Sequence, residues 1–246
     1  MLRFFDYFLK GIDNGMLQHP KVRLEVREFA HQIKEVRDED QWPLADTSWT
    51  PLYLDGQRHL LTSDQIAGSP VTSFDVTQGS ITFSYVFDHD TEVVGPMQLT
   101  VHVELEGCDD AYLFAGLQKF HRGKEVSFEG TYGFENDIVS KGALRVALRT
   151  VNDNLSLPYW PDYDFDTPKP LSPGEIVPLI FQLEAAATFY RKGDELRLTI
   201  EGRNVISGKI IDQPFKFPHY RTGTCKIHTE PKNPNQLLLP ITGRDS

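Results

Sequence analysis

The chain has 246 residues and a net charge of −10, with 35 acidic residues against 25 Lys and Arg residues. It is long enough to bury a sizeable core, and it lacks the basic stripe that nucleic-acid phosphates require, so we expect no nucleic-acid partner. The sequence contains no run of 18 apolar residues, so we predict no membrane-spanning helix. The N-terminus is interrupted by Asp6 and does not match a secretory signal. Cys108 and Cys225 have no metal or redox spacing, which favours reduced thiols in a cytoplasmic protein.

The N-terminal segment carries apolar residues at helical spacing. Phe4, Phe5, Phe8 and Leu9 recur at i, i+1, i+4 and i+5, which predicts a short amphipathic helix that ends at Gly11. A helix this short is marginal in water when isolated. We therefore expect its apolar side to need a surface on which to dock.

Most of the remaining chain alternates between apolar and polar residues, which is typical of half-buried strands. Turn signals separate these stretches, and helical patterns are almost absent after residue 20. The predicted strands are Val22–Val26, Trp49–Gly56, Ile81–Phe87, Leu99–Leu105, Tyr112–Phe120, Gly142–Thr150, Cys225–His228 and Leu237–Ile241, with loops at Leu60–Pro70 and Phe215–Tyr220. Many short strands joined by turns predict a β-sandwich or jelly roll.

The stretch Ser172–Asn204 predicts two strands around a glycine turn. An apolar run from Ile176 to Leu183 follows a Pro-Gly turn, and Pro178 within it indicates an edge strand or a bulge. Phe189 and Tyr190 are assigned to a short linker. A second strand with strict alternation then follows, with Leu196, Leu198 and Ile200 on its apolar face.

Motifs for catalysis or metal binding are missing from the sequence. An α/β-hydrolase places its nucleophile in G-x-S-x-G, and no serine here has glycine on both sides at that spacing. The eight histidines are scattered, so we assign no catalytic residue and expect no cofactor. Asp162, Asp164 and Asp166 begin like an EF-hand loop, but Thr167 and Pro173 replace its required Gly and Glu. We expect no metal site, although a calcium site of another type stays open.

Aromatic residues gather in one Pro-bounded loop that also contains Tyr159. Trp160, Tyr163 and Phe165 are candidates for contact with a substrate, because aromatic rings can hold a sugar or cover a hydrophobic ester pocket. The alternative is that these rings pack under the edge of the sheet.

Several segments together resemble the C-terminal non-catalytic domain of X-Pro dipeptidyl-peptidases and cocaine-esterase-like (CocE/NonD) serine hydrolases. The central segment runs from Phe189 to Ile200, with Gly193 and then Leu196-Arg197-Leu198, and the loop PKPLSPGE at Pro168–Glu175 matches well. The order of LKGIDNG, VRLEV, DEDQWP and LYLDG near the N-terminus is also similar to that family, as is NQLLLP near the C-terminus. The segment GALRVALR at Gly142–Arg149 is less similar.

The resemblance implies a galactose-binding-like jelly roll at residues 47–246, preceded by the end of an α/β-hydrolase domain and a linker at residues 1–46. It implies a non-catalytic domain of an acyl esterase or X-Pro dipeptidyl-peptidase that caps or shapes the active site and supports assembly. The implied partner is the catalytic α/β-hydrolase domain of the same parent protein. No position here matches the family's catalytic residues, and the connection from Leu54 to Ile81 is shorter than in its relatives.

Two alternatives stay open beside this hypothesis: a stand-alone jelly-roll module that binds carbohydrate or peptide, and a structural domain that forms homo-oligomers. The leading hypothesis makes a physical prediction that the others do not. Phe4, Phe5, Phe8 and the face formed by Val22, Leu24 and Val26 should be poorly covered, because the catalytic domain is their natural partner.

Overall fold

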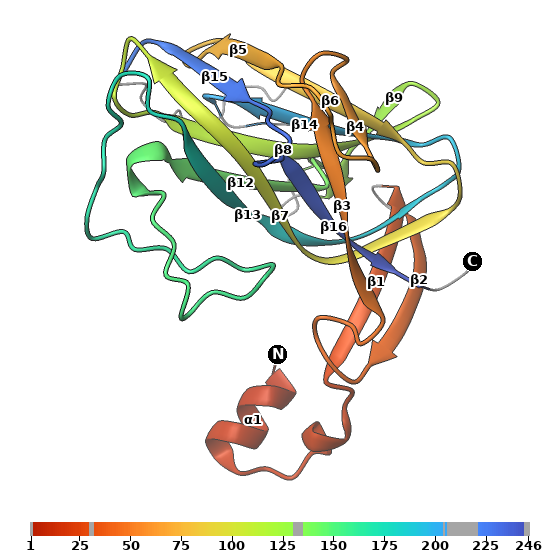
Figure 1. The fold of residues 1–246 in the computed structure, drawn as a ribbon. Helices are drawn as coiled ribbons and strands as arrows, with labels where there is room; N and C mark the ends of the chain where they lie inside the picture. The colour runs from red at the N-terminus through yellow and green to blue at the C-terminus, as the bar shows by residue number, and fades with distance from the viewer. Residues whose placement is uncertain (1, 30–31, 130–134, 204, 206–220, 244–246) are drawn as a thin grey trace.

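The computed structural model describes residues 2–29, 32–129, 135–203, 205 and 221–243, and within them the chain is mainly β (Figure 1). The helical elements are α1 (Leu2–Lys10) and the 3-10 helices η1 (Met16–Gln18) and η3 (Val146–Leu148). The strands are β1 (Val22–Phe29), β2 (Gln32–Glu39), β3 (Thr47–Asp55), β4 (Leu60–Thr62), β5 (Val71–Asp75), β6 (Ser80–Val86), β7 (Thr91–Glu106), β8 (Tyr112–His121), β9 (Lys124–Val126), β10 (Phe128–Glu129), β11 (Glu135–Asp137), β12 (Ser140–Arg145), β13 (Val177–Tyr190), β14 (Glu195–Glu201), β15 (Thr224–His228) and β16 (Gln236–Thr242).

One 14-stranded sheet curls on itself to form a β-sandwich, as predicted. Its main path runs β12-β8-β14-β6-β4-β3-β16-β7-β13-β1-β2, with β5, β9 and β15 attached beside it. The first strand of this path returns to β13: the Ser140 hydroxyl of β12 donates a hydrogen bond of 2.6 Å to the Glu184 carbonyl. Gly142 in β12 lies so close that an added Cβ would be 2.3 Å from the Gln182 carbonyl oxygen. Glycine is therefore what allows the curled sheet to close here.

The interior of the curled sheet is one continuous apolar core. Every second side chain of a long strand faces this core. In β7, for example, Leu99, Val101 and Val103 are buried while the residues between them face outward. β13 and β14 do the same with the alternating apolar residues that the sequence indicated, including Leu198. Each fully buried side chain of this size stabilises the fold by roughly 1.5–3 kcal/mol.

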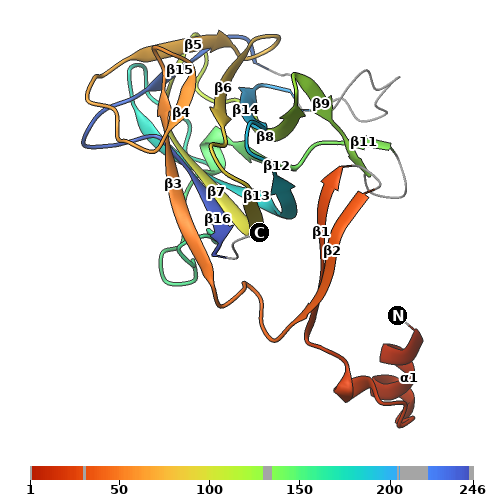
Figure 2. The same cartoon turned by 90° about the vertical axis from the view of Figure 1, so that its right-hand side faces the viewer.

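The β1–β2 hairpin forms an arm that extends below the sandwich (Figures 1 and 2). The arm joins the sheet where Arg27 of β1 pairs in parallel with Thr188 of β13. The predicted exposure of the β1 apolar face is wrong, because Leu24 and Val26 are buried, with only Val22 half-buried. They pack in a small cluster of their own with Leu44, Val94 and Phe189, so the arm and the sheet edge cover this face without any further domain.

Most of the predicted strands are present, with several differences. β2, β5, β9, β10 and β11 were not expected, and β4 lies within the predicted loop at Leu60–Pro70. The predicted strand Gly142–Thr150 is only partly present, because β12 ends at Arg145 and the 3-10 helix η3 follows it. The predicted linker at Phe189 and Tyr190 is wrong, because β13 continues through these residues after a bulge between Leu183 and Ala186. The predicted loop at Phe215–Tyr220 lies outside the described residues.

Candidate functional surface

The N-terminal helix exposes its aromatic side to solvent. α1 has no buried residue, and the rings of Phe4, Phe5 and Phe8 are 46%, 44% and 54% exposed. The Phe4 ring contacts both of the others, with centroid distances of 5.5 Å to Phe5 and 4.7 Å to Phe8. The predicted exposure of these phenylalanines is therefore confirmed. A contiguous aromatic patch of this kind is a candidate docking surface.

Local hydrogen bonds hold the segment after α1 in a fixed turn. Lys10 forms an i,i+4 ion pair with Asp6, and the Asn14 side-chain amide donates to the Arg3 carbonyl at 2.8 Å. Gly11 ends the helix with a left-handed φ of 67°, which glycine adopts readily. A cleft between α1 and η1 is lined by Tyr7, Phe8, Gly11, Asp13, Gly15, Leu17 and Gln18. The segment thus presents a shaped apolar surface rather than a frayed end.

The predicted aromatic loop lies on the same side of the sandwich as α1, below the sheet in Figures 1 and 2. Trp160 and Phe165 are 46% and 59% exposed, and Leu155 and Leu157 beside them are also exposed. Trp160 is held by a short turn in which its backbone exchanges hydrogen bonds with Leu157. Many of the large exposed apolar residues therefore lie in two segments below the sheet, the α1 segment and this loop.

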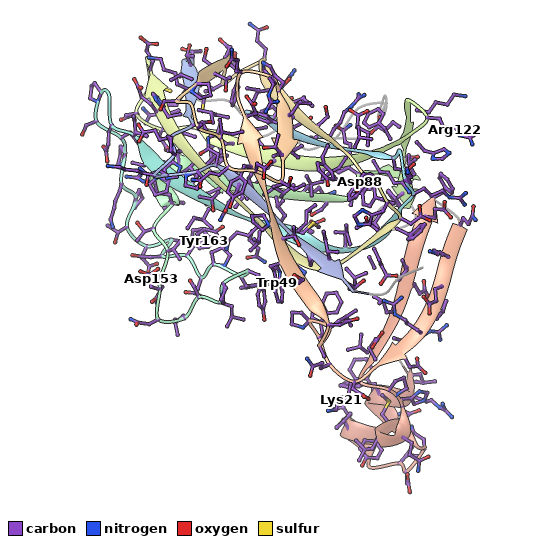
Figure 3. All side chains as sticks on the ribbon, turned by 45° about the vertical axis from the view of Figure 1, so that its right-hand side comes forward. Lys21, Trp49, Asp88, Arg122, Asp153 and Tyr163 are labelled. Carbon is purple, nitrogen blue, oxygen red and sulfur yellow. The ribbon has the colours of Figure 1, made fainter. Side chains whose placement is uncertain are left out.

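Tyr163 has a different environment from its two neighbours in the loop. It is partly buried, and Figure 3 shows it between the loop and the sandwich, whereas Asp153 lies at the outer end of the loop. Its hydroxyl donates to the Ile180 carbonyl at 2.5 Å and accepts from the Gln182 backbone N–H at 3.0 Å. Burial raises the pKa of Tyr163 to about 12. The hydroxyl thus fastens the loop to β13.

A second aromatic contact fixes the loop at its other end. Tyr159 stacks face to face on Trp49 of β3, with ring centroids 4.4 Å apart and an interplanar angle of 2°. The Trp49 indole N–H donates to the Pro96 carbonyl. Of the four predicted loop aromatics, two anchor the loop and two, Trp160 and Phe165, face solvent. Contact of Trp160, Tyr163 or Phe165 with a substrate stays a prediction.

A buried group of charges lies where the arm meets the sandwich. The Lys119 ammonium, fully buried, donates to the carbonyls of Glu28 and Phe189 at 2.8 and 2.6 Å and lies 3.1 Å from an Asp194 carboxylate oxygen. Burial lowers the pKa of Lys119, against the opposing charge of Asp194. A buried lysine beside an acid can mark a catalytic site. Here Lys119 and Asp194 are 0% and 1% exposed, so no substrate reaches them, and the group joins β1, β8, β13 and the turn that follows β13 structurally.

Histidine and carboxylate side chains meet at three further places in the described chain. His121 contacts Asp194 at 2.6 Å, His228 contacts Glu104 at 2.9 Å, and His89 contacts Asp88 on the surface. Within the described residues, none of these histidines is hydrogen bonded to a serine hydroxyl. The described residues therefore contain no nucleophile–histidine–acid arrangement.

No helix among the described residues is both long and apolar enough to cross a bilayer. The curled sheet defines a β-sandwich domain that exposes two apolar segments. The family model of the X-Pro dipeptidyl-peptidase C-terminal non-catalytic domain matches residues 14–238. The chain belongs to this family, and it corresponds to the C-terminal portion of CocE/NonD-type hydrolases.

Individual relatives agree with this assignment. The chain is 24% identical over 277 residues to cocaine esterase of Rhodococcus sp. (strain MB1 Bresler), a match that covers 98% of this chain and 45% of that protein. A CocE/NonD family hydrolase from Staphylococcus aureus is 32% identical in its crystal structure, with a TM-score of 0.88 and coverage of 98% of this chain and 45% of that one. An aminopeptidase from a Thaumarchaeota archaeon, 14% identical with a TM-score of 0.66 over 98% of this chain and 43% of that one, shares the fold. The chain thus spans somewhat less than half the length of these relatives.

Proposed function

We propose that this chain is the domain that docks on the catalytic α/β-hydrolase domain of its parent protein and closes one side of that domain's active site. The aromatic side of α1 is the observation that carries the proposal. Three clustered phenylalanines about half exposed are unusual in a protein whose core is otherwise continuous. In the sequence order of the family, the catalytic domain lies on the N-terminal side of this segment, so it is the nearest surface that could cover them.

The loop that carries Trp160 and Phe165 is a second exposed apolar segment, separate from α1 but also below the sandwich (Figures 1 and 2). Because α1 and the loop lie on the same side of the sandwich, a catalytic domain seated on α1 would bring its surface toward the loop (Figure 1). Trp160 and Phe165 would then form part of the wall of a pocket for an apolar acyl or leaving group. The parent would cleave an ester, or an amide such as an X-Pro peptide bond, by acyl transfer through a serine of the catalytic domain.

The docking half of the proposal can be tested by producing the chain and the catalytic domain of its parent as separate polypeptides. We expect the two to co-elute in size-exclusion chromatography and the complex to hydrolyse p-nitrophenyl esters. Burial of each phenylalanine contributes roughly 1.5–3 kcal/mol, so the triple change of Phe4, Phe5 and Phe8 to Ser should abolish co-elution. The matched control is Val71→Ser with Val86→Ser, because both residues are similarly exposed but lie on β5 and β6 rather than on α1. Co-elution that survives the triple change would refute docking through α1.

The pocket half has a separate readout in the reconstituted complex. Trp160→Ala and Phe165→Ala should raise KM for aryl esters several-fold while the complex still co-elutes. If both variants keep the KM of the unchanged chain, the loop does not contact substrate. Binding of simple sugars to the isolated chain in calorimetry, lost in Trp160→Ala, would instead support a stand-alone carbohydrate module.

A further inference from the structure

Two histidines from distant parts of the sequence stand side by side on the outer face of the sandwich. His102 of β7 and His228 of β15 are direct partners across the antiparallel pair of strands. Side chains in such positions start from Cβ atoms roughly 4.5–5.5 Å apart. Both point away from the core, because their neighbours Val101, Val103 and Ile227 are the buried residues. They open into a pocket of about 280 Å³ whose other lining residues are Ile176, Pro178, Glu230 and Asn233.

Asn235 fixes the orientation and tautomer of His102. The Asn235 amide nitrogen donates to the His228 carbonyl at 3.0 Å and to the Thr229 hydroxyl at 3.1 Å, while its oxygen accepts from the His102 backbone N–H at 2.8 Å. The same oxygen is 3.1 Å from Nδ1 of His102. Since this oxygen can only accept, Nδ1 must carry the proton. The neutral ring therefore has its lone pair on Nε2.

Glu104 fixes the other ring in the same manner. Nε2 of His228 lies 2.9 Å from a Glu104 carboxylate oxygen, and Lys226 lies 3.3 Å from the other oxygen. Glu104 presents a carboxylate flanked by Lys226, and a carboxylate oxygen accepts hydrogen bonds rather than donating them. Nε2 of His228 therefore carries the proton, and Nδ1 has the lone pair when the ring is neutral. Two imidazoles, each held by a second residue, thus offer one lone-pair nitrogen each.

We infer that His102 and His228 bind one Zn²⁺ ion through Nε2 and Nδ1, with water completing the coordination. Imidazole nitrogen suits borderline ions such as Zn²⁺, whereas Mg²⁺ and Ca²⁺ require oxygen ligands. The supports given by Asn235 and Glu104 match the outer-shell partners that orient metal-binding histidines. Glu230, on the lining of the pocket, favours a cation. Among the described residues no three His, Cys, Asp or Glu side chains gather as ligands, so the protein supplies two and affinity is modest.

Calorimetric titration of the 246-residue chain, prepared without a polyhistidine tag, tests this inference. We expect one Zn²⁺ per chain and no heat from Ca²⁺ or Mg²⁺ at the same concentrations. His102→Gln and His228→Gln should each weaken Zn²⁺ binding at least tenfold. His89→Gln is the matched control, because His89 is exposed and also contacts a carboxylate, and it should bind as the unchanged chain does. Each variant is first melted without metal to establish that it is folded.

Glu104→Ala separates a positioning role from a purely structural one. It leaves both ligands in place but removes the acceptor that fixes the His228 tautomer, so affinity for Zn²⁺ should fall on the order of tenfold. Replacement of Zn²⁺ by Co²⁺ gives a second readout, since bound Co²⁺ has visible absorption that the histidine variants should lose. Absence of Zn²⁺ binding by the unchanged chain, or equal binding by the variants at His102 and His228, would overturn the inference.

Discussion

Replacement of Lys119 by Met removes the centre of the buried charge group that joins the arm to the sandwich. All three ammonium protons have acceptors, namely two backbone carbonyls and the Asp194 carboxylate. Methionine fills a similar volume, so the change removes the charge and the hydrogen bonds while it largely keeps the packing. The loss in folding free energy therefore reports the value of these polar contacts.

The magnitude follows from what the substitution leaves behind. The carbonyls of Glu28 and Phe189 each lose a buried donor, at a cost of about 1–3 kcal/mol per group. Asp194 keeps its contacts to His121 and to the Arg191 backbone N–H but loses its counter-ion. Removal of one partner of a buried ion pair typically costs about 3–5 kcal/mol. We expect Lys119→Met to lower the free energy of unfolding by about 3–5 kcal/mol.

Urea unfolding at 25 °C and pH 7 measures the effect. With an m-value of about 3 kcal/mol/M, the midpoint should fall by roughly 1–1.7 M. Lys10→Met is the control, because Lys10 forms an exposed i,i+4 pair, and it should change stability by at most about 0.5 kcal/mol. In Lys119→Met with Asp194→Asn, the loss should be smaller than the sum of the single losses. A loss below about 1 kcal/mol for Lys119→Met would refute the structural role assigned to this group.

Two further predictions concern single side chains. Asp55 is buried, and burial alone would raise its pKa. Hydrogen bonds from the Arg58 side chain and from the backbone N–H groups of Arg58 and Gln57 outweigh this effect, so the pKa of Asp55 lies below its ordinary value. Because the folded pKa of Asp55 lies below the unfolded value of about 3.9, its stabilisation is present above that pH and is lost as the pH falls through the folded pKa. In urea unfolding at several pH values, Asp55→Asn should therefore lose less free energy of unfolding between about pH 5 and pH 2.5 than the unchanged chain does. An equal loss in the two proteins would contradict this. Tyr163→Phe should lower the free energy of unfolding by about 1–3 kcal/mol, because it leaves the Ile180 carbonyl and the Gln182 N–H of β13 without their partner. Phe165→Leu should lower it by less than about 0.5 kcal/mol. Thermal melts in which Phe165→Leu is the less stable variant would contradict the anchoring role of Tyr163.

Local alternation made most of the sandwich predictable. β6, β14 and the second half of β7 keep one apolar face, so their parity alone identifies the core, whereas the first half of β7 and the middle of β8 are buried on both faces. Lys119 shares the parity of Leu113 and Leu117 in β8, which places it on the inward face, and this signal could have identified it as a buried charge. β2 gives no such signal, because it is polar on both faces. It is held instead by its pairing with β1 and by Arg37, which contacts Glu92 some fifty residues further along the chain.

The candidate sites could be predicted less well than the sandwich, because contacts between distant parts of the chain form them. The aromatic loop was found from composition, but only the contacts of Tyr159 with Trp49 and of Tyr163 with β13 separate its anchors from its exposed rings. The histidine pair could not be predicted, because residues 102 and 228 meet only through the pairing of β15 with β7. The buried face of β1 was predicted wrongly for a related reason, since its cover comes from Val94 and Phe189 on distant strands.

The sandwich does not need its exposed apolar segments in order to fold. The main core is continuous and draws on β3 to β8 and β12 to β16, and α1 contributes no buried residue to it. Folding stability therefore cannot explain why three phenylalanines cluster on α1 or why Trp160 and Phe165 face solvent near the same side. A requirement for binding can explain both, because exposed aromatic area has a cost in water that only a partner surface offsets. That requirement is what the docking experiment with the α1 variants measures.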